Sequence, residues 1–173
     1  GLTGGPIYNS GSHQTLETAG VDPNVPINTV APGGSTKSVR IGNSFNGGGA
    51  EYLSKSFIVT ATNANISFWY ALVLQNPIGH AASAQPSFKV RVIDNSNNNE
   101  ITGVTNLGNG SNELIADKNN PFFQNTVVSN EPVVYKDWSC AQINLSNHIG
   151  KSITIEFTTK DCSAGGHYGY AYI

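Results

Sequence analysis

The sequence predicts an all-β fold, a two-sheet antiparallel sandwich of the jelly-roll or Greek-key type. About nine short runs of apolar or alternating residues are separated by Gly, Pro and Asn turns roughly every ten residues, as in such sandwiches. No segment has the periodicity of an amphipathic helix, and no tandem repeat is present. A chain of 173 residues is long enough for one domain that buries roughly 70% of its unfolded surface. We therefore expect a single domain over residues 1–173.

The N-terminal part, residues 1–36, is predicted to be extended and irregular. Gly and Pro interrupt it repeatedly, at Gly4-Gly5-Pro6, Asp22-Pro23, Val25-Pro26 and Pro32-Gly33-Gly34, so no helix is expected. We expect one short edge strand near residues 13–16, after which the segment wraps around the body of the domain.

Five strands are predicted in the central part, over residues 38–41, 51–60, 66–74, 87–93 and 100–104. Alternation places Leu53, Phe57 and Val59 on the inward face of the second of them. The third is the most apolar run of the chain. It is predicted to be a central strand covered on both sides, although a short buried helix has the same pattern.

The C-terminal part combines an irregular excursion with a long terminal hairpin. Residues 105–131 are the least regular, and such excursions are usually functional or mobile. A bent strand is predicted over residues 133–145, followed by strands over 152–160 and 168–173. The loop between the last two holds Asp161, Cys162, Gly165, Gly166 and His167. This loop is either a functional loop on a rigid sheet or a simple hairpin turn.

Charge excludes some classes of partner. Only 12% of the residues are charged, and the formal net charge is −2. Asparagine is about as frequent as the four charged types together. No basic run is present, which argues against binding to nucleic acid or to an anionic membrane. No apolar run is long enough to span a bilayer, so no membrane insertion is predicted.

Enzyme motifs are absent from the sequence. It contains no G-x-S-x-G elbow, phosphate-binding loop, dinucleotide fingerprint, C-x-x-C pair or H-E-x-x-H motif. Glycoside cleavage needs two carboxylates that face each other across a groove, and no pair of acidic residues stands out. We therefore predict that the protein is not an enzyme.

The two cysteines, Cys140 and Cys162, allow two interpretations. In an exported protein they are expected to form a disulfide that closes a loop of about 22 residues and adds roughly 3 kcal/mol of stability. In a reducing compartment they would be small buried side chains.

Two of the four histidines are candidates for a binding site. His80 and His167 each follow a glycine on a loop beside an apolar strand, and such loops meet at one end of a jelly roll. One hypothesis is a polar ligand pocket formed by His80, Gln85, Asp161 and His167. The other is that these imidazoles brace the loops through hydrogen bonds to the backbone. His13 and His148 belong to no local zinc-binding pattern.

A structural calcium ion is a further expectation, because loops rich in carboxylate and amide oxygens supply the ligands that calcium needs. The candidate ligands are Asp22, Asn43, Glu51 and Asp161. No EF-hand spacing is present.

Aromatic residues offer a second kind of site, since sugar C–H groups stack on aromatic rings. Tyr168 and Tyr170 on the final strand are candidates for contact with a ligand, together with Tyr172. We expect Trp69 and Trp138 to lie in the core instead.

Several segments carry a resemblance to a known family. They are Val39-Arg40-Ile41-Gly42-Asn43, the run over residues 68–75, Gly79-His80, Gln85-Pro86-Ser87-Phe88-Lys89-Val90-Arg91-Val92-Ile93-Asp94, and the stretch from Asp137-Trp138 to the end Gly166-His167-Tyr168-Gly169-Tyr170-Ala171-Tyr172-Ile173, together with Asp22-Pro23-Asn24 and Ala31-Pro32-Gly33-Gly34. They resemble a domain of very large surface adhesins of gliding bacteria that use the type IX secretion system. The resemblance covers nearly the whole chain from about His13. A looser likeness is to MAM-like and carbohydrate-binding jelly rolls.

The resemblance implies an exported module on the bacterial cell surface, concerned with attachment. It does not supply a defined binding site. Related sequences often pair the cysteine that corresponds to Cys162 with a partner in the region of residues 100–110, where this chain has no cysteine.

We therefore expect a noncatalytic, extracellular adhesin module that binds glycan or another surface polymer and is monomeric in isolation. Its other partners would be neighbouring domains of the same chain. Two alternatives remain open: a structural spacer in a large surface protein, and an accessory domain that targets a secreted hydrolase to polysaccharide. An exposed aromatic residue on the final strand would favour binding over the spacer.

Overall fold

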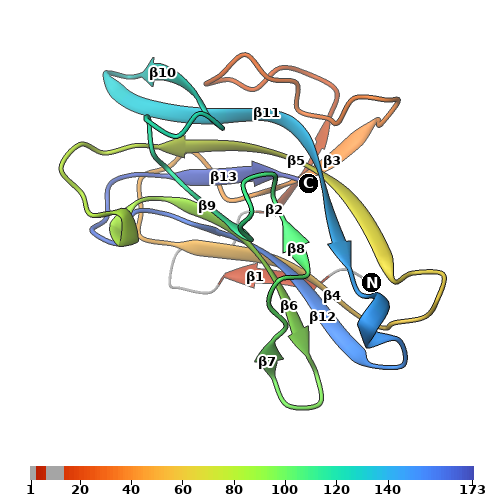
Figure 1. Ribbon diagram of the computed structural model, residues 1–173. Coiled ribbons are helices and arrows are strands. Elements are labelled where there is room, and N and C mark those ends of the chain that lie inside the picture. The colour runs from red at the N-terminus through yellow and green to blue at the C-terminus, as the bar shows by residue number, and fades with distance from the viewer. Residues whose placement is uncertain (1–2, 7–13) are drawn as a thin grey trace.

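The computed structural model describes residues 3–6 and 14–173. The chain forms two antiparallel β-sheets that pack face to face, which confirms the predicted all-β sandwich (Figure 1). The only helices in the described part of the chain are two 3₁₀ turns, η1 (Ala82–Ala84) and η2 (Ser146–His148). No helix in these ranges has the length and apolar character that a membrane crossing requires.

The first sheet has six strands in the order β1-β4-β12-β6-β7, with β9 also paired to β6. Their bounds are β1 (Thr3–Pro6), β4 (Ala50–Ile58), β12 (Ser152–Lys160), β6 (Ser87–Asp94), β7 (Asn99–Glu100) and β9 (Glu113–Ile115). The alternation of Ile153 and Ile155 with Thr154 and Glu156 gives β12 one buried face and one more exposed face.

The second sheet has seven strands in the order β10-β11-β5-β13-β3-β2, with β8 also paired to β11. Their bounds are β10 (Gln124–Val128), β11 (Glu131–Asn144), β5 (Asn65–Gln75), β13 (Gly169–Tyr172), β3 (Lys37–Ile41), β2 (Gln14–Thr18) and β8 (Thr105–Asn106). β11 is the predicted bent strand, and its register shifts between Lys136 and Ser139, where a bulge bends it.

The main core lies between the sheets. It contains inward side chains of both sheets. Five of them are fully buried: Tyr70, Leu72, Phe88, Val90 and Ile153. Full burial of large apolar side chains of this kind typically stabilises a fold by about 1.5–3 kcal/mol each. This core is the principal source of stability in the described part of the chain.

A second core covers the outer face of the second sheet. Val25 and Ile27 of the N-terminal segment pack there with Ala71, Val73 and Tyr172. This segment crosses the outer side of β11, β5 and β3 in Figure 1. It explains why the run in β5 is apolar on both faces: residues 70–75 are covered by the first sheet on one side and by the segment on the other.

The irregular parts differ from the prediction in three places. The first is β1 (Thr3–Pro6), because the N-terminal segment was expected to hold a single strand, near residues 13–16. The strand predicted over residues 100–104 is wrong, because the ladder ends at Glu100 and Gly103 adopts a positive φ of 74°. Residues 105–131 contain three short strands, β8, β9 and β10, that the sequence did not predict. The edge strand expected near residues 13–16 is β2, at the margin of the second sheet. His13 lies outside the described residues.

Successive long strands alternate between the sheets. β3 belongs to the second sheet, β4 to the first, β5 to the second and β6 to the first, and β12 and β13 repeat this exchange. Lys160 pairs with both Ala50 and Ser87, so the loops 42–49, 76–86 and 161–168 all leave the sandwich at one end. We call this the loop end.

Candidate functional site

Backbone hydrogen bonds join the three loops of the loop end to one another. Asp161 N donates to Gly49 O at 2.8 Å, and Ser163 N donates to Ala84 O at 3.1 Å. Within the 161–168 loop, Cys162 N donates to His167 O at 3.0 Å. The side chains on these loops are therefore carried by a connected backbone and not by separate turns.

Three of the predicted pocket residues lie close together. The rings of His80 and His167 meet edge to face, with centroids 5.2 Å apart and planes at 88°. Gln85 Nε2 donates to Pro77 O at 2.9 Å and, at 3.4 Å, to His80 O. Gln85 therefore braces the loop that carries His80. Asp161 is turned to other partners, described below.

Cys162 joins the two histidines, which the sequence did not predict. His80 Nδ1 lies 3.1 Å from Cys162 Sγ. The side chain of Cys162 is fully buried, whereas both imidazoles are half-buried. Cys162 and His167 are five residues apart on one loop, but His80 is 82 residues away from Cys162 in sequence. The spacing in the sequence therefore indicates that Cys162 and His167 are close, but it does not indicate that His80 joins them.

The predicted disulfide between Cys140 and Cys162 is not formed. Both cysteines are free, and Cys140 is exposed while Cys162 is buried. Cys140 is held on β11 opposite Trp69 of β5, and Cys162 lies in the interior of the 161–168 loop. The sequence distance between them allowed a bridge, but the sheet fixes Cys140 on an exposed surface.

Two buried carboxyl groups form a second cluster at the loop end. Glu51, on β4, is 2% exposed, and Asp161, which follows β12, is 7% exposed. Burial raises the pKa of Glu51 to about 7, and the nearby charge of Asp161 adds to the rise, while the Thr159 hydroxyl opposes it. The ion pairs found among the described residues involve other carboxylates.

Asp161 also links two loops through its carboxylate. Its Oδ1 accepts a hydrogen bond from Gly169 N at 2.9 Å and its Oδ2 accepts one from Gly49 N at 3.2 Å. Burial raises the pKa of Asp161 to about 6, and these two hydrogen bonds oppose the rise. The arrangement offers hard oxygen ligands in a buried site.

The four predicted calcium ligands are not all brought together. Asp22 lies against the second core, where its carboxylate accepts hydrogen bonds from the hydroxyls of Tyr170 and Tyr172. Asn43 Oδ1 accepts a hydrogen bond from Phe45 N at 2.6 Å, which closes a local turn. Only Glu51 and Asp161 of the predicted set are neighbours.

The two tyrosines of the final strand β13, and Tyr168 just before it, offer no exposed aromatic surface. Tyr168, Tyr170 and Tyr172 are 4%, 1% and 0% exposed. Burial, with a further contribution from the charge of Asp22, raises the pKa of the Tyr168 hydroxyl to about 12. These residues belong to the second core because the N-terminal segment covers them.

The two tryptophans differ from each other. Trp69 is 41% exposed on the first half of β5, so its expected place in the core is wrong. Trp138 packs partly against the second core, and its Nε1 donates to Asn28 O at 2.8 Å. The N-terminal segment covers Ala71 and Val73 but leaves Trp69 uncovered.

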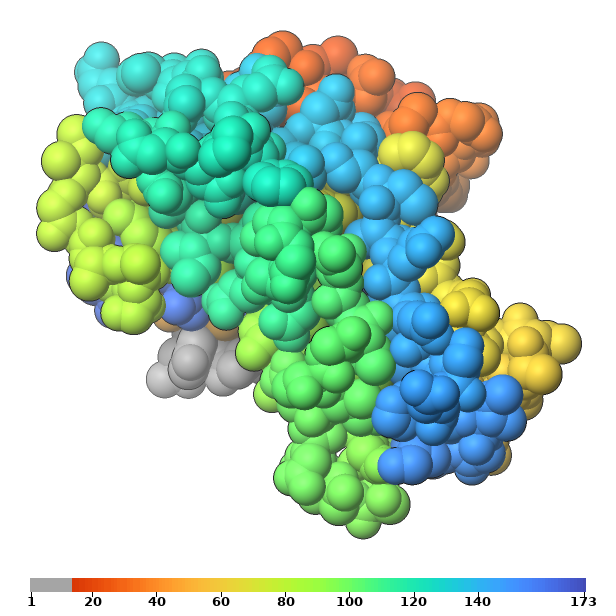
Figure 2. Space-filling view, in the orientation of Figure 1, coloured from red at the N-terminus to blue at the C-terminus, as the bar shows by residue number. Residues whose placement is uncertain are grey.

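A polar hollow of about 430 Å³ lies beside the histidine cluster. It is bounded by the 76–86 loop and by residues 109–120, which lie side by side in Figure 2. Asn76 joins these walls, because its Nδ2 donates to Ala116 O at 3.2 Å and its Oδ1 accepts from Lys118 N at 2.8 Å. The lining includes eight polar side chains: Asn76, His80, Gln85, Asn109, Ser111, Glu113, Asp117 and Asn120.

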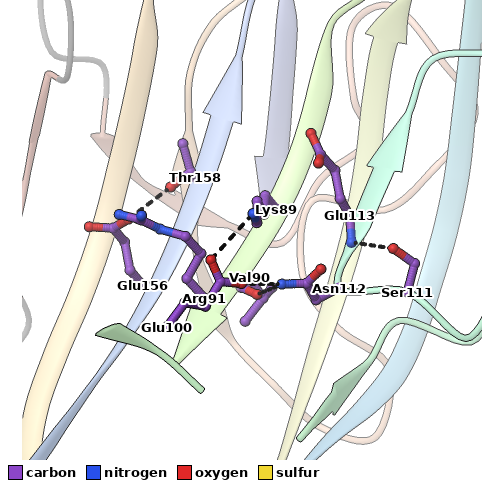
Figure 3. Close-up of polar contacts among 9 residues, drawn as sticks. All are labelled: Lys89, Val90, Arg91, Glu100, Ser111, Asn112, Glu113, Glu156 and Thr158. Atoms are coloured by element: carbon purple, nitrogen blue, oxygen red, sulfur yellow. Dashed lines mark hydrogen bonds and ion pairs between the residues drawn. The ribbon is translucent and has the colours of Figure 1, made fainter. Parts of the chain in front are cut away.

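The outer face of the first sheet next to the polar hollow carries a network of charged side chains (Figure 3). Arg91 contacts Glu156 Oε1 through Nε at 3.0 Å and Nη2 at 2.6 Å. Lys89 Nζ lies 3.4 Å from Glu100 Oε2, and Asn112 Nδ2 donates to Glu100 Oε1 at 2.8 Å. These contacts hold the charged groups in fixed positions on β6, β7 and β12.

Glu113 connects the two surfaces. It lines the polar hollow and also a smaller hollow of about 270 Å³, which Lys89 and Arg91 line as well. Its backbone N–H is bonded to Ser111 Oγ at 3.0 Å, which fixes the start of β9. In the described part of the chain, no hydrogen bond or ion pair engages its carboxylate. Glu113 is therefore a positioned carboxylate with free hydrogen-bonding capacity.

Comparison with known proteins adds no family. The chain matches no protein-family model and none of the curated proteins. The resemblance to the adhesins of gliding bacteria therefore stays a prediction from the sequence.

Proposed function

We propose that the protein is a noncatalytic binding module that attaches to glycan or to a similar polar polymer, as part of an extracellular surface adhesin. The observation that carries this proposal is the free carboxylate of Glu113 between two adjoining hollows. Sugar hydroxyls are bound by fixed carboxylate and amide groups that converge on one concave surface. The polar hollow offers such groups on two segments, the 76–86 loop and residues 109–120.

The walls of the polar hollow are rigid enough for this role. Asn76 and Gln85 are almost fully buried, and their amides are bonded to each other and to backbone atoms of the walls. Tyr70, in the main core, donates a hydrogen bond to Leu107 O and so holds the start of the 105–120 segment. Binding to such a preformed surface costs little ordering of the protein.

Calcium belongs to the same proposal as a structural ion. Glu51 and Asp161 are the residues that would hold it, and their oxygens are the hard ligands that calcium prefers. The bound ion would neutralise two buried carboxylates, and backbone carbonyl oxygens and water would complete its coordination. Asp22 and Asn43 are assigned no part in it, since their oxygens already accept local hydrogen bonds.

A structural spacer is the second candidate, and the burial of Tyr168, Tyr170 and Tyr172 favours it. A spacer has no need of an aromatic binding surface, and the final strand presents none. The two candidates differ in the expected role of Glu113. Its carboxylate would bind ligand in a binding module, whereas a spacer has no ligand for it to bind.

The test is binding to a broad array of glycans and bacterial polysaccharides. It compares the wild type with a variant in which the carboxylates that line the hollow are replaced by amides. We expect Glu113→Gln combined with Asp117→Asn to weaken binding at least about tenfold, as expected when hydrogen bonds to charged groups are lost. Glu131→Gln is the matched control, because Glu131 is exposed and does not line the polar hollow.

Binding that is equal in the wild type and the double variant would contradict a site at the polar hollow. A wild-type chain that binds no glycan or polysaccharide on the array would favour the spacer. Melting curves of all three proteins show whether a loss of binding reflects a loss of folding.

A further inference from the structure

His80, Cys162 and His167 form a compact set of metal-binding side chains. Their ligand atoms all lie within 4.8 Å of one another, and His80 Nδ1 lies 3.1 Å from Cys162 Sγ. In a tetrahedral zinc site the same atoms are about 3.3–3.6 Å apart, given metal–nitrogen bonds of about 2.0 Å and metal–sulfur bonds of about 2.3 Å. The contact at 3.1 Å is slightly shorter than that range and no pair is separated by more than 4.8 Å, so small side-chain rotations suffice for coordination.

The backbone around the three residues is fixed before any ion arrives. Cys162 and His167 close their loop through the bond from Cys162 N to His167 O, and Gly165 N donates to Cys162 O at 2.9 Å. Ser163 N and Lys160 Nζ donate to Ala84 O and Ser83 O on the loop that carries His80. An ion would therefore bind to loops that are already docked, which lowers the entropy cost of assembling the site.

One atom of the cluster is among the six buried side-chain nitrogen and oxygen atoms of the described residues that have no hydrogen-bond partner. His167 Nδ1 is inaccessible to solvent and forms no hydrogen bond with any described residue. A buried ring nitrogen without a partner is costly, and such groups in native structures call for an explanation such as an ion. Coordination of a metal at this cluster supplies one.

The chemistry of the ligands selects the ion. One thiolate and two imidazoles suit a borderline or soft transition-metal ion and not calcium or magnesium. The chain contains no methionine, so the axial thioether of a typical blue-copper site has no source within it. Three protein ligands also leave the fourth tetrahedral position of zinc for water.

A catalytic thiol is a poorer explanation of the same cluster. A nucleophilic cysteine must reach its substrate, but Cys162 is 0% exposed. A metal ion does not need an exposed sulfur, because it can reach Cys162 Sγ past the two imidazoles, which are only half-buried.

We propose that His80, Cys162 and His167 bind one zinc ion, which clamps the 76–86 loop to the 161–168 loop. Cys162 binds as the thiolate and its proton passes to solvent, so the step involves no oxidation. His80 lines the polar hollow as well, so the ion would also fix one wall of that hollow. The proposal does not depend on what the hollow binds.

The test uses the whole chain, freed of metal and kept reduced with a phosphine that does not compete for zinc. Titration with Co²⁺ should give one equivalent of bound ion, a thiolate-to-cobalt charge-transfer band and the visible bands of a four-coordinate ion. Zn²⁺ should then displace the cobalt and raise the melting temperature.

Variants separate the cluster from the rest of the chain. Cys162→Ser should abolish the charge-transfer band, and His80→Ala and His167→Ala should each weaken cobalt binding at least about tenfold. Cys140→Ser and His148→Ala are the matched controls and should bind as the wild type does. Circular dichroism in EDTA identifies any variant that fails to fold. If Cys162→Ser is unfolded, the cobalt affinities of His80→Ala and His167→Ala test the site instead.

Three results would overturn the proposal. One is a wild-type chain that gives no charge-transfer band with Co²⁺. Another is a band that survives in folded Cys162→Ser. The third is a band that Cys140→Ser removes as completely as Cys162→Ser does.

Discussion

At the scale of single residues, Asp22 holds the N-terminal segment on the second sheet. Its carboxylate accepts hydrogen bonds from Tyr172 OH at 2.6 Å, from Tyr170 OH, and from the N–H groups of Asn24 and Val25. Burial and the charge of Asp22 keep the pKa values of Tyr170 and Tyr172 well above their ordinary range, so both hydroxyls stay protonated and donate. Hydrogen bonds to a buried charged group are among the stronger ones in proteins.

Replacing Asp22 should therefore loosen the whole segment. We expect Asp22→Asn to lower the free energy of unfolding by about 2 kcal/mol, because an amide meets two hydroxyl donors with one acceptor oxygen instead of two. Urea denaturation measures the change. Asp137→Asn, at an exposed position, is the control and should change stability by less than about 0.5 kcal/mol. Equal effects of the two substitutions would contradict the role of Asp22.

At the scale of elements, the end of β6 is tied to the start of β12 by an ion pair. Lys151 Nζ lies 2.7 Å from Asp94 Oδ2, and Ser96 donates to Asp94 Oδ1 from its hydroxyl and its backbone N–H. These hydrogen bonds, with that from Lys151 first, hold the pKa of Asp94 well below its usual range. The folded state therefore favours the ionised carboxyl.

This ion pair gives stability a defined pH dependence. The contribution of Asp94 is complete above its unfolded pKa of about 3.9 and is lost as the pH falls toward the lower folded value. The difference in unfolding free energy between the wild type and Asp94→Asn should therefore shrink between about pH 5 and pH 2. Lys55→Met, at an exposed position on β4, serves as a control without such a trend. A difference that stays constant over this range would contradict the prediction.

The long strands could be predicted because their own residues show which face is buried. In β12 the inward residues alternate strictly with outward ones, and β4 and β6 behave similarly. β10 was missed because this strand pairs only with β11 at the margin of the sheet and has no fully buried side chain. The exposure of Trp69 was missed because the residues of β5 do not show how much of this strand the N-terminal segment covers. The segment covers Ala71 and Val73 but not Trp69.

The candidate sites were predictable to a similar extent. The sequence placed His80 and His167 on loops that meet, because the order of strands brings those loops to one end. For Cys162 it left open a disulfide or a small buried side chain, and it missed the contact with His80 because that contact crosses 82 residues and no local spacing reveals it. Asp22 looked like a calcium ligand by residue type, yet two tyrosine hydroxyls already bind its carboxylate.

At the scale of the whole molecule, the loop end joins the two sheets through closely packed backbone. Gly42 follows β3 with a φ of 84°, and a Cβ atom there would lie 2.6 Å from Gly169 O and 3.1 Å from Thr159 Oγ1. Residues of both sheets thus meet around Glu51 and Asp161. An ion bound to these carboxylates would oppose unfolding of the entire sandwich.

Calcium should therefore raise the melting temperature of the whole chain as one transition. Calcium at about 100 times its dissociation constant adds about 2.7 kcal/mol to stability, and for a chain of this size each kcal/mol raises the melting temperature by about 2–4 °C. We expect a rise of about 5–10 °C over the value in EDTA, read by calorimetry.

Glu51→Gln should abolish the rise without destabilising the apo protein, because it removes one of two neighbouring buried charges. Glu17→Gln, on the edge strand β2, should keep the full response. A wild-type melting temperature that is the same in calcium, magnesium and EDTA would leave the pair as a brace between loops, because the bonds from Gly49 and Gly169 to Asp161 need no ion.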